Sequence, residues 1–114
     1  MHRIFNVPFA DIYPMYVAKL ERKGRNEREL REAIAWLTGF DDHQLKSLIS
    51  TKANMAEFFQ AAKLNSGAER ITGVVCGVRV EEIEDPLMQK IRYLDKLVDE
   101  LARGKAMEKV LRQA

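Results

Sequence analysis

The densest cluster of side chains that could do chemistry is an acidic run at residues 81–85, which contains Glu81, Glu82, Glu84 and Asp85. Carboxylates this close together can bind a hard cation such as Mg²⁺, and one of them, if buried, can act as an acid with a raised pKa. Acidic residues just before a helix also interact favourably with its dipole, and Asp85 precedes Pro86, a typical first residue of a helix. Because no second group of carboxylates completes a coordination sphere, we favour this structural role and expect neither a metal site nor a cofactor.

The one cysteine, Cys76, lies in segment 73–77, where flanking glycines would let a substrate approach a nucleophile. Its other neighbours are valines, and a thiol among apolar side chains is usually a small buried group whose pKa is raised. The two histidines available as a base, His2 and His43, lie in polar surroundings, and nothing local places either beside the thiol. The chain also lacks the phosphate-binding, dinucleotide-binding, zinc-protease and serine-hydrolase motifs, which excludes the common motif-bearing enzyme classes.

Residues 31–48 have a spacing similar to that of a helix-turn-helix, with Gly39 at the turn. The second helix of such a motif would begin at Asp41 and Asp42, whose charges repel phosphate. The contacts left for DNA would be Arg31, His43, Lys46 and Ser47. Any two antiparallel helices joined by a glycine turn share this spacing, so a DNA-binding regulator is an alternative interpretation and nucleic acid is not the expected partner.

Composition bounds the class of protein. The chain has 114 residues, of which 46% are hydrophobic and 32% charged, as in one globular domain. Nineteen basic against seventeen acidic residues leave a formal charge of +2, too small to indicate a nucleic-acid or membrane partner. The first residues do not form a secretory signal, no apolar run is long enough to span a bilayer, and a single cysteine agrees with a reducing compartment. We therefore expect a cytoplasmic protein with no membrane partner.

Helix-start signals recur along the chain. Each pairs a capping side chain with Glu or Gln three residues later, a capping box that satisfies the first unpaired amides of a helix. The pairs are Asn26 with Glu29, Asp41 with Gln44, Asn54 with Glu57, and Ser66 with Glu69, and Asp85-Pro86 marks a fifth start. Asp11 is the expected cap of the first helix, which ends at Gly24, and a last short helix carries Met107, Val110 and Leu111. We predict a mainly α, single domain over residues 1–114 with about six short helices.

Residues 71–80 are ambiguous between a helix and a strand. Their β-branched side chains favour a strand, yet Ile71, Val74, Val75 and Val78 also form a helical stripe. The capping pair of Ser66 and Glu69 would serve no purpose before a strand, so we favour a helix. If the segment is instead a strand, the expected partner is segment 3–7.

The helix from Pro86 has an apolar seam typical of a left-handed helix pair. The seam residues are Leu87, Ile91, Leu94, Val98 and Leu101. Met88, Tyr93 and Leu97 lie beside them, which gives the helix more apolar width than a simple surface helix needs. We therefore favour a homodimer that joins two copies of the chain through this seam.

Five segments carry a resemblance that runs nearly end to end: 9–24, 36–40, 71–88, 91–101 and 104–109. Through them the sequence resembles a bacterial family of uncharacterised proteins, domain of unknown function 2200. It implies a small, stand-alone, single-domain bacterial protein and supplies no activity, cofactor or catalytic residue.

The resemblance directs attention to the block from Cys76 to Pro86. Arg79 lies between two valines and just before Glu81 and Glu82, so it either fixes a turn through a buried ion pair or holds a carboxylate or phosphate ligand. We favour the ion pair. The leading functional hypothesis is a non-enzymatic interaction protein, homodimeric and with an unidentified protein partner. The alternatives are the DNA-binding regulator and a small-ligand or enzymatic site near Cys76, Arg79 and Glu82.

Overall fold

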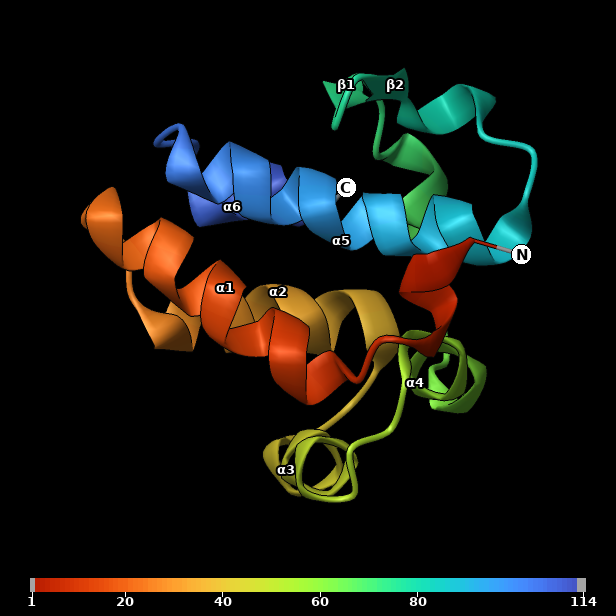
Figure 1. Ribbon diagram of the computed structural model, residues 1–114. Helices are drawn as coiled ribbons and strands as arrows, with labels where there is room; N and C mark the ends of the chain where they lie inside the picture. Colours follow the sequence, from red (N-terminus) through yellow and green to blue (C-terminus); the bar gives the residue numbers. More distant parts are fainter. Residues whose placement is uncertain (1, 113–114) are drawn as a thin grey trace.

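The computed structural model of the protein describes residues 2–112 and is mainly helical (Figure 1). The 3₁₀ helices are η1 (Arg3–Asn6), η2 (Ser66–Arg70) and η3 (Val80–Glu82), and the strands are β1 (Val74–Val75) and β2 (Val78–Arg79). The α-helices of the described part are α1 (Phe9–Arg22), α2 (Glu27–Thr38), α3 (Asp42–Ser50), α4 (Met55–Ala61), α5 (Pro86–Ala102) and α6 (Met107–Val110). The predicted mainly α class is confirmed. No helix among residues 2–112 is long and apolar enough to cross a membrane.

The predicted starts of α2, α3, α4 and α5 are confirmed. Asn26, Asp41 and Asn54 each accept a hydrogen bond from the backbone three residues on, and each receives the reciprocal bond that completes a capping box. At α5, Asp85 accepts from the backbone N–H of Met88, and proline occupies the first helical position. These local signals were sufficient because a cap and its partner lie in one helical turn.

The start of α1 differs from the prediction. The helix begins at Phe9 after Pro8, and not at Asp11. The backbone N–H of Phe9 donates to the carbonyl of Ala53 at 2.8 Å, and Met55 donates back to the carbonyl of Val7 at 2.9 Å. This backbone pairing with a distant segment satisfies the first amide of the helix, a role that the sequence assigned to a local cap.

The start predicted at Ser66 is also corrected. The element there is the 3₁₀ helix η2, and its cap is Asn65, whose side chain accepts from the backbone N–H of Gly67 at 2.7 Å. The amide of Asn65 also donates to the carbonyl of Trp36 at 3.0 Å, which joins η2 to α2.

The two candidate caps give a matched pair of substitutions. Asn65→Ala is expected to lower the free energy of unfolding by about 1.5 kcal/mol, because it removes a cap and a half-buried hydrogen bond. Ser66→Ala is expected to change it by less than about 0.5 kcal/mol, because the exposed Ser66 has no capping bond. Urea denaturation of both variants measures the difference, and equal losses would contradict this assignment.

The helix predicted for residues 71–80 is wrong, because the segment forms a two-stranded antiparallel hairpin. Cys76 and Gly77 make its two-residue turn with φ angles of 51° and 78°, left-handed values that a right-handed helix excludes. The alternative partner, segment 3–7, is also wrong, because residues 3–6 form η1. A two-residue turn lets β1 pair with the strand directly after it, so no distant partner is needed.

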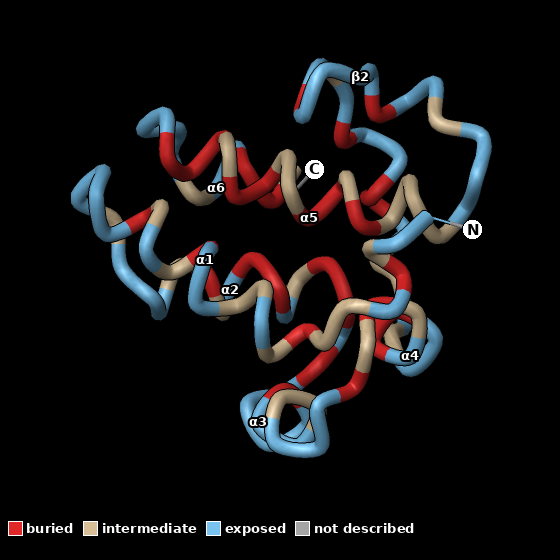
Figure 2. The backbone as a smooth tube through the Cα atoms, in the orientation of Figure 1, coloured by how far each residue is buried: buried red, intermediate tan, exposed pale blue. Residues whose placement is uncertain are grey.

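Helix α5 lies at the centre of the fold and packs against α1, α2, α4 and α6. Figure 2 shows its buried positions in red along most of its length, whereas α3 is largely exposed. Tyr16 and Lys19 of α1 contact Asp95 and Asp99 of α5, in the same order along both helices, so α1 and α5 run parallel (Figure 1).

The predicted dimer seam is part of this core. Ile91, Leu94, Val98 and Leu101 are at most 1% exposed, and Leu87 is half-buried against the same cluster. The apolar face of α5 thus packs on helices of its own chain, and little of it is left for a second copy.

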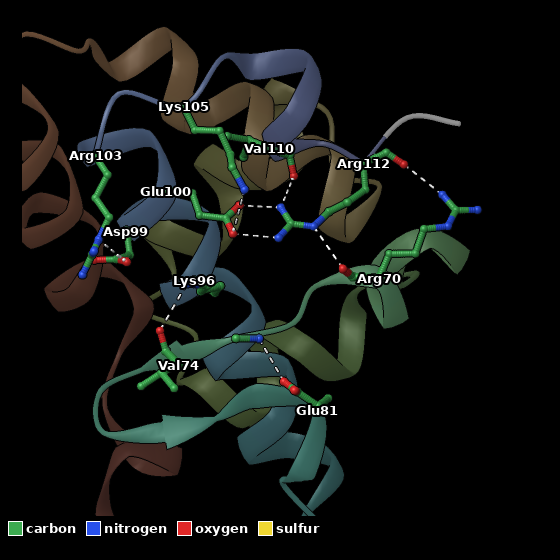
Figure 3. Close-up of polar contacts among 11 residues, drawn as sticks. Arg70, Val74, Glu81, Lys96, Asp99, Glu100, Arg103, Lys105, Val110 and Arg112 are labelled. Atoms are coloured by element: carbon green, nitrogen blue, oxygen red, sulfur yellow. Dashed lines mark hydrogen bonds and ion pairs between the residues drawn. The ribbon is translucent and has the colours of Figure 1, made fainter.

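A cluster of ion pairs connects the end of the described chain to α5 (Figure 3). Arg112 makes two hydrogen bonds to the carboxylate of Glu100, whose side chain is 7% exposed, and Lys105 lies 3.4 Å from the same carboxylate. Arg112 also exchanges two hydrogen bonds with Arg70 of η2, one through its backbone carbonyl and one through its Nε. Glu100 of α5 therefore binds Arg112 after α6, and through Arg112 it connects α5 to Arg70 of η2.

Candidate functional site

A groove of about 540 Å³ lies between η1, α1 and α5. This volume is in the range of small-molecule sites in proteins. The lining residues are Ile4, Ile12, Met15, Tyr16, Ala18, Lys19, Arg22, Arg92 and Asp95. Ile4 and Ile12 line its end near η1, Lys19 and Arg22 lie toward the end of α1, and Arg92 lies one turn before Asp95 on α5.

One face of α1 forms the longest wall of the groove. Ile12, Met15, Lys19 and Arg22 are spaced three, four and three residues apart, and side chains at that spacing share one side of a helix. Met15 is 64% exposed, although an unbranched apolar side chain gains from burial. The face of α1 that points away from the core is thus partly apolar where it borders the groove.

The wall on the side of α5 is polar and centres on Asp95. Its carboxylate accepts a hydrogen bond from the hydroxyl of Tyr16 at 2.5 Å and one from the guanidinium of Arg92 at 2.6 Å. The thiol of Cys76, at the tip of the hairpin, lies 3.8 Å from the second oxygen. Asp95 therefore joins α1, α5 and the hairpin at one point.

The hydroxyl of Tyr16 and the thiol of Cys76 hold their protons firmly. Burial, and then the charge of Asp95, raise the pKa of the Tyr16 hydroxyl well above its ordinary value. Cys76 is exposed at the hairpin turn, so the buried thiol expected from the sequence is wrong, but partial burial of the sulfur and then the charge of Asp95 still raise the pKa of the thiol. Because neither group loses its proton near neutral pH, neither supplies a nucleophile or a general base. The cluster is a fixed polar support for the groove.

The charges around the groove are unequal. Arg92 is paired with Asp95, and Lys19 lies 3.5 Å from Asp99. Among residues 2–112, Arg22 has no carboxylate within ion-pair distance. The lining thus holds three cations and one carboxylate, and the exposed Arg22 is the cation whose charge is not balanced by a neighbouring side chain.

The residues predicted as a ligand site do not form a pocket. Arg79 lies 3.4 Å from Glu81 in an ion pair that is exposed, and not buried as the favoured interpretation expected. Glu81 accepts a hydrogen bond from the backbone N–H of Gly73, the contact that most lowers the pKa of Glu81 (Figure 3). Glu82 is exposed and lines none of the grooves.

Within the rest of the acidic run, Asp85 has the capping role expected from the sequence. Asp85 caps α5, and Glu84 is exposed beside it. In the described part of the chain, no group of three or more His, Cys, Asp or Glu side chains is placed to hold a metal ion. The run therefore belongs to the hairpin and the start of α5, and of the predicted ligand residues only Cys76 reaches the groove wall.

The residues of the DNA-binding alternative are spread over two helices. His43, Lys46 and Ser47 lie exposed on α3, and Arg31 is half-buried on α2. Helix α3 packs chiefly on α1, and exposed Asp42 begins it. An acidic first turn on the helix that would enter the groove of DNA repels phosphate, so the geometry adds no support to this alternative.

The raised pKa of Cys76 predicts slow alkylation. In the folded protein at pH 7.5, iodoacetamide is expected to modify Cys76 more slowly than free cysteine, because the thiolate is scarce. Asp95→Asn removes the charge that disfavours the thiolate and is expected to speed the reaction, whereas Asp99→Asn is a control one turn further along α5. Mass spectrometry measures both rates, and a thiol as reactive as free cysteine would contradict the raised pKa.

Tyr16, Arg92 and Asp95 were not predicted as site residues. Arg92 and Asp95 are three apart on one helix, a spacing visible in the sequence. Tyr16 lies 79 positions from Asp95, and nothing local indicates that α1 and α5 pack in parallel. The groove is a product of this long-range packing.

Three comparisons place the chain among known proteins. The model of an uncharacterized protein family conserved in bacteria, DUF2200, matches residues 3–112. A crystal structure of uncharacterized protein SP1917 is similar, with a TM-score of 0.90 and 42% sequence identity over 97% of this chain and 93% of that chain. No curated protein matches.

Proposed function

The chain belongs to the DUF2200 family of uncharacterized bacterial proteins, and from that premise we propose that it is a non-enzymatic binding protein that takes up a small, mainly apolar molecule in the groove between α1 and α5. The observation that carries the proposal is the groove itself, which has a ligand-sized volume and an exposed Met15 at its rim.

The chemistry of the wall supports binding over catalysis. Asp95 already accepts from Tyr16 and Arg92, and the Cys76 thiol lies against it, so the carboxylate is engaged. Tyr16 and Cys76 keep their protons near neutral pH. A site whose polar groups bond to one another can orient a ligand, but it offers no free base or nucleophile.

The proposal keeps the non-enzymatic role expected from the sequence, but places the binding surface in the groove between α1 and α5 and not on the seam of α5. The interaction surface predicted on α5 lies mostly in the core, so the homodimer is not part of the proposal. The small-ligand alternative is kept, but its site is the groove beside Asp95, which Cys76 contacts, and not the surface at Arg79 and Glu82.

A neutral apolar fluorophore tests the proposal without involving charge. N-Phenyl-1-naphthylamine is expected to bind saturably to the native protein, with its fluorescence raised by the apolar surroundings. Ala18→Trp fills the groove and is expected to abolish this binding. Ala35→Trp, the same change at an exposed position of α2 outside the groove, is expected to leave it intact.

Circular dichroism checks that both tryptophan variants fold. If the fluorophore does not bind saturably, or if Ala18→Trp binds it as the native protein does, the groove is not a binding site and the proposal fails.

A further inference from the structure

The charge of Arg22, which is unpaired in the described chain, and the length of the groove indicate what kind of ligand the groove binds. This inference rests on the proposed function. We infer that the groove takes a straight acyl chain with an anionic head group, a carboxylate or a phosphate, with the head at Arg22 and the chain directed toward Ile12 and Ile4.

The sign of the head group follows from the lining. Lys19, Arg22 and Arg92 face two carboxylates, Asp95 in the lining and Asp99 beside Lys19, so the local charge is positive by one. Two of these cations already have carboxylate partners, Lys19 with Asp99 and Arg92 with Asp95. A cationic head group would be repelled, and an anionic head group gains an interaction that nothing else in the described chain supplies to Arg22.

The position of the head follows from the location of Arg22 in the last turn of α1. A guanidinium is planar and offers paired donors that match the two oxygens of a carboxylate or phosphate. Lys19 lies one turn earlier on the same helix face, within reach of the same head group.

The shape of the tail follows from the rest of the groove. Ile12 is ten residues before Arg22, which corresponds to about 15 Å along an α-helix. An extended chain advances about 1.2 Å per bond, so this distance fits about ten to twelve carbons. Between the two ends lie Met15, Ala18 and the ring of Tyr16, whose hydroxyl is occupied by Asp95, and Ile4 closes the far end.

Displacement of N-phenyl-1-naphthylamine tests the inference with ligands of one chain length. Decanoate and decyl phosphate are expected to displace the fluorophore with dissociation constants at least about fivefold lower than those of decanol and decylamine, since a partly exposed ion pair is worth about 1 kcal/mol. Decanoate is also expected to bind more tightly than hexanoate, because each buried methylene adds to the affinity. The comparison of decanoate with decyl phosphate identifies which head group is preferred.

A substitution locates the head group. Arg22→Met keeps an unbranched, flexible side chain and removes the charged guanidinium, so it is expected to weaken decanoate binding about fivefold and leave decanol binding unchanged. Arg28→Met is the matched control, because Arg28 is an exposed arginine on α2 that does not line the groove.

The outcomes separate this inference from the proposed function. If decanol and decylamine bind as tightly as decanoate, or if Arg22→Met weakens all three equally, the anionic head at Arg22 is refuted while the groove remains a binding site. If the fluorophore itself fails to bind, the proposed function fails and the inference fails with it.

Discussion

Phe58→Ala is expected to produce the largest loss of stability in this protein, about 4 kcal/mol in the free energy of unfolding. Phe58 is completely buried and lies among three other rings. It stacks on Phe9 with ring centroids 4.0 Å apart, and meets Phe40 and Phe59 edge-on at 5.1 and 5.0 Å. Alanine leaves a cavity at the point where α1, α4 and the turn after α2 meet, and these backbones cannot all close it.

Urea denaturation monitored by circular dichroism measures this loss. Phe5→Ala is the matched control, because Phe5 is near the edge of the core with 7% of its surface exposed. Its one neighbouring ring is that of His2, 6.2 Å away. We expect Phe5→Ala to cost about half as much as Phe58→Ala. Equal losses would mean that the ring cluster contributes no more than ordinary apolar burial.

Glu100→Ala is expected to lower the free energy of unfolding by about 3 kcal/mol. The carboxylate of Glu100 is the shared acceptor for Arg112 and Lys105, and the side chain of Arg112 is only 12% exposed. Removing one partner of a largely buried ion pair leaves the other charged and without water around it. This costs more free energy than replacing both partners by apolar side chains. Without Glu100, Arg112 is no longer held in place for its two hydrogen bonds to Arg70, so the contact between η2 and the end of the described chain is weakened.

Arg103→Ala gives the contrast for this prediction. Arg103 also pairs with an acidic residue of α5, Asp99 at 3.0 Å, but its side chain is 76% exposed. Solvent screens such a pair, so the expected loss is below about 1 kcal/mol. Thermal unfolding of the two variants at the same pH compares a buried ion pair with an exposed one in one helix. A large loss for Arg103→Ala, or a negligible loss for Glu100→Ala, would contradict the difference in burial.

The helix starts could be predicted from the sequence wherever a cap and its partner lie within one turn. Asn26, Asp41 and Asn54 are such cases, and Asp85 is another. The prediction was wrong where a distant contact replaced the local cap. Phe9 begins α1 because the carbonyl of Ala53 accepts its N–H, and no short pattern contains that information.

The hairpin forms where the sequence predicts a helix, because the glycines at 73 and 77 determine the local structure more strongly than the apolar stripe of residues 71–78 does. The stripe from Ile71 to Val78 fits a helix, but Gly73 and Gly77 both adopt positive φ, and Cys76 does so beside them. Glycines at both ends of two valines and a cysteine are typical of a tight turn with short strands, and the capping signal at Ser66 belonged to a separate 3₁₀ turn.

The candidate site could be predicted in part only. The Cys76 segment was identified, whereas the groove was not, because its walls come from the two ends of the chain. The seam of α5 was recognised as apolar, and the sequence alone does not distinguish packing on the same chain from packing on a second copy.

The parallel arrangement of α1 and α5 also has a consequence for how the chain folds. Neighbouring helices in a bundle usually meet through short loops, but Tyr16 and Asp95 close a loop of 79 positions. The entropy of closing such a loop must be overcome before the contacts on either side of it contribute, so we expect slower folding than for a helical bundle of the same length with local contacts. The three α-helices between these partners, α2, α3 and α4, can form early, and the groove is complete only when α5 packs on α1.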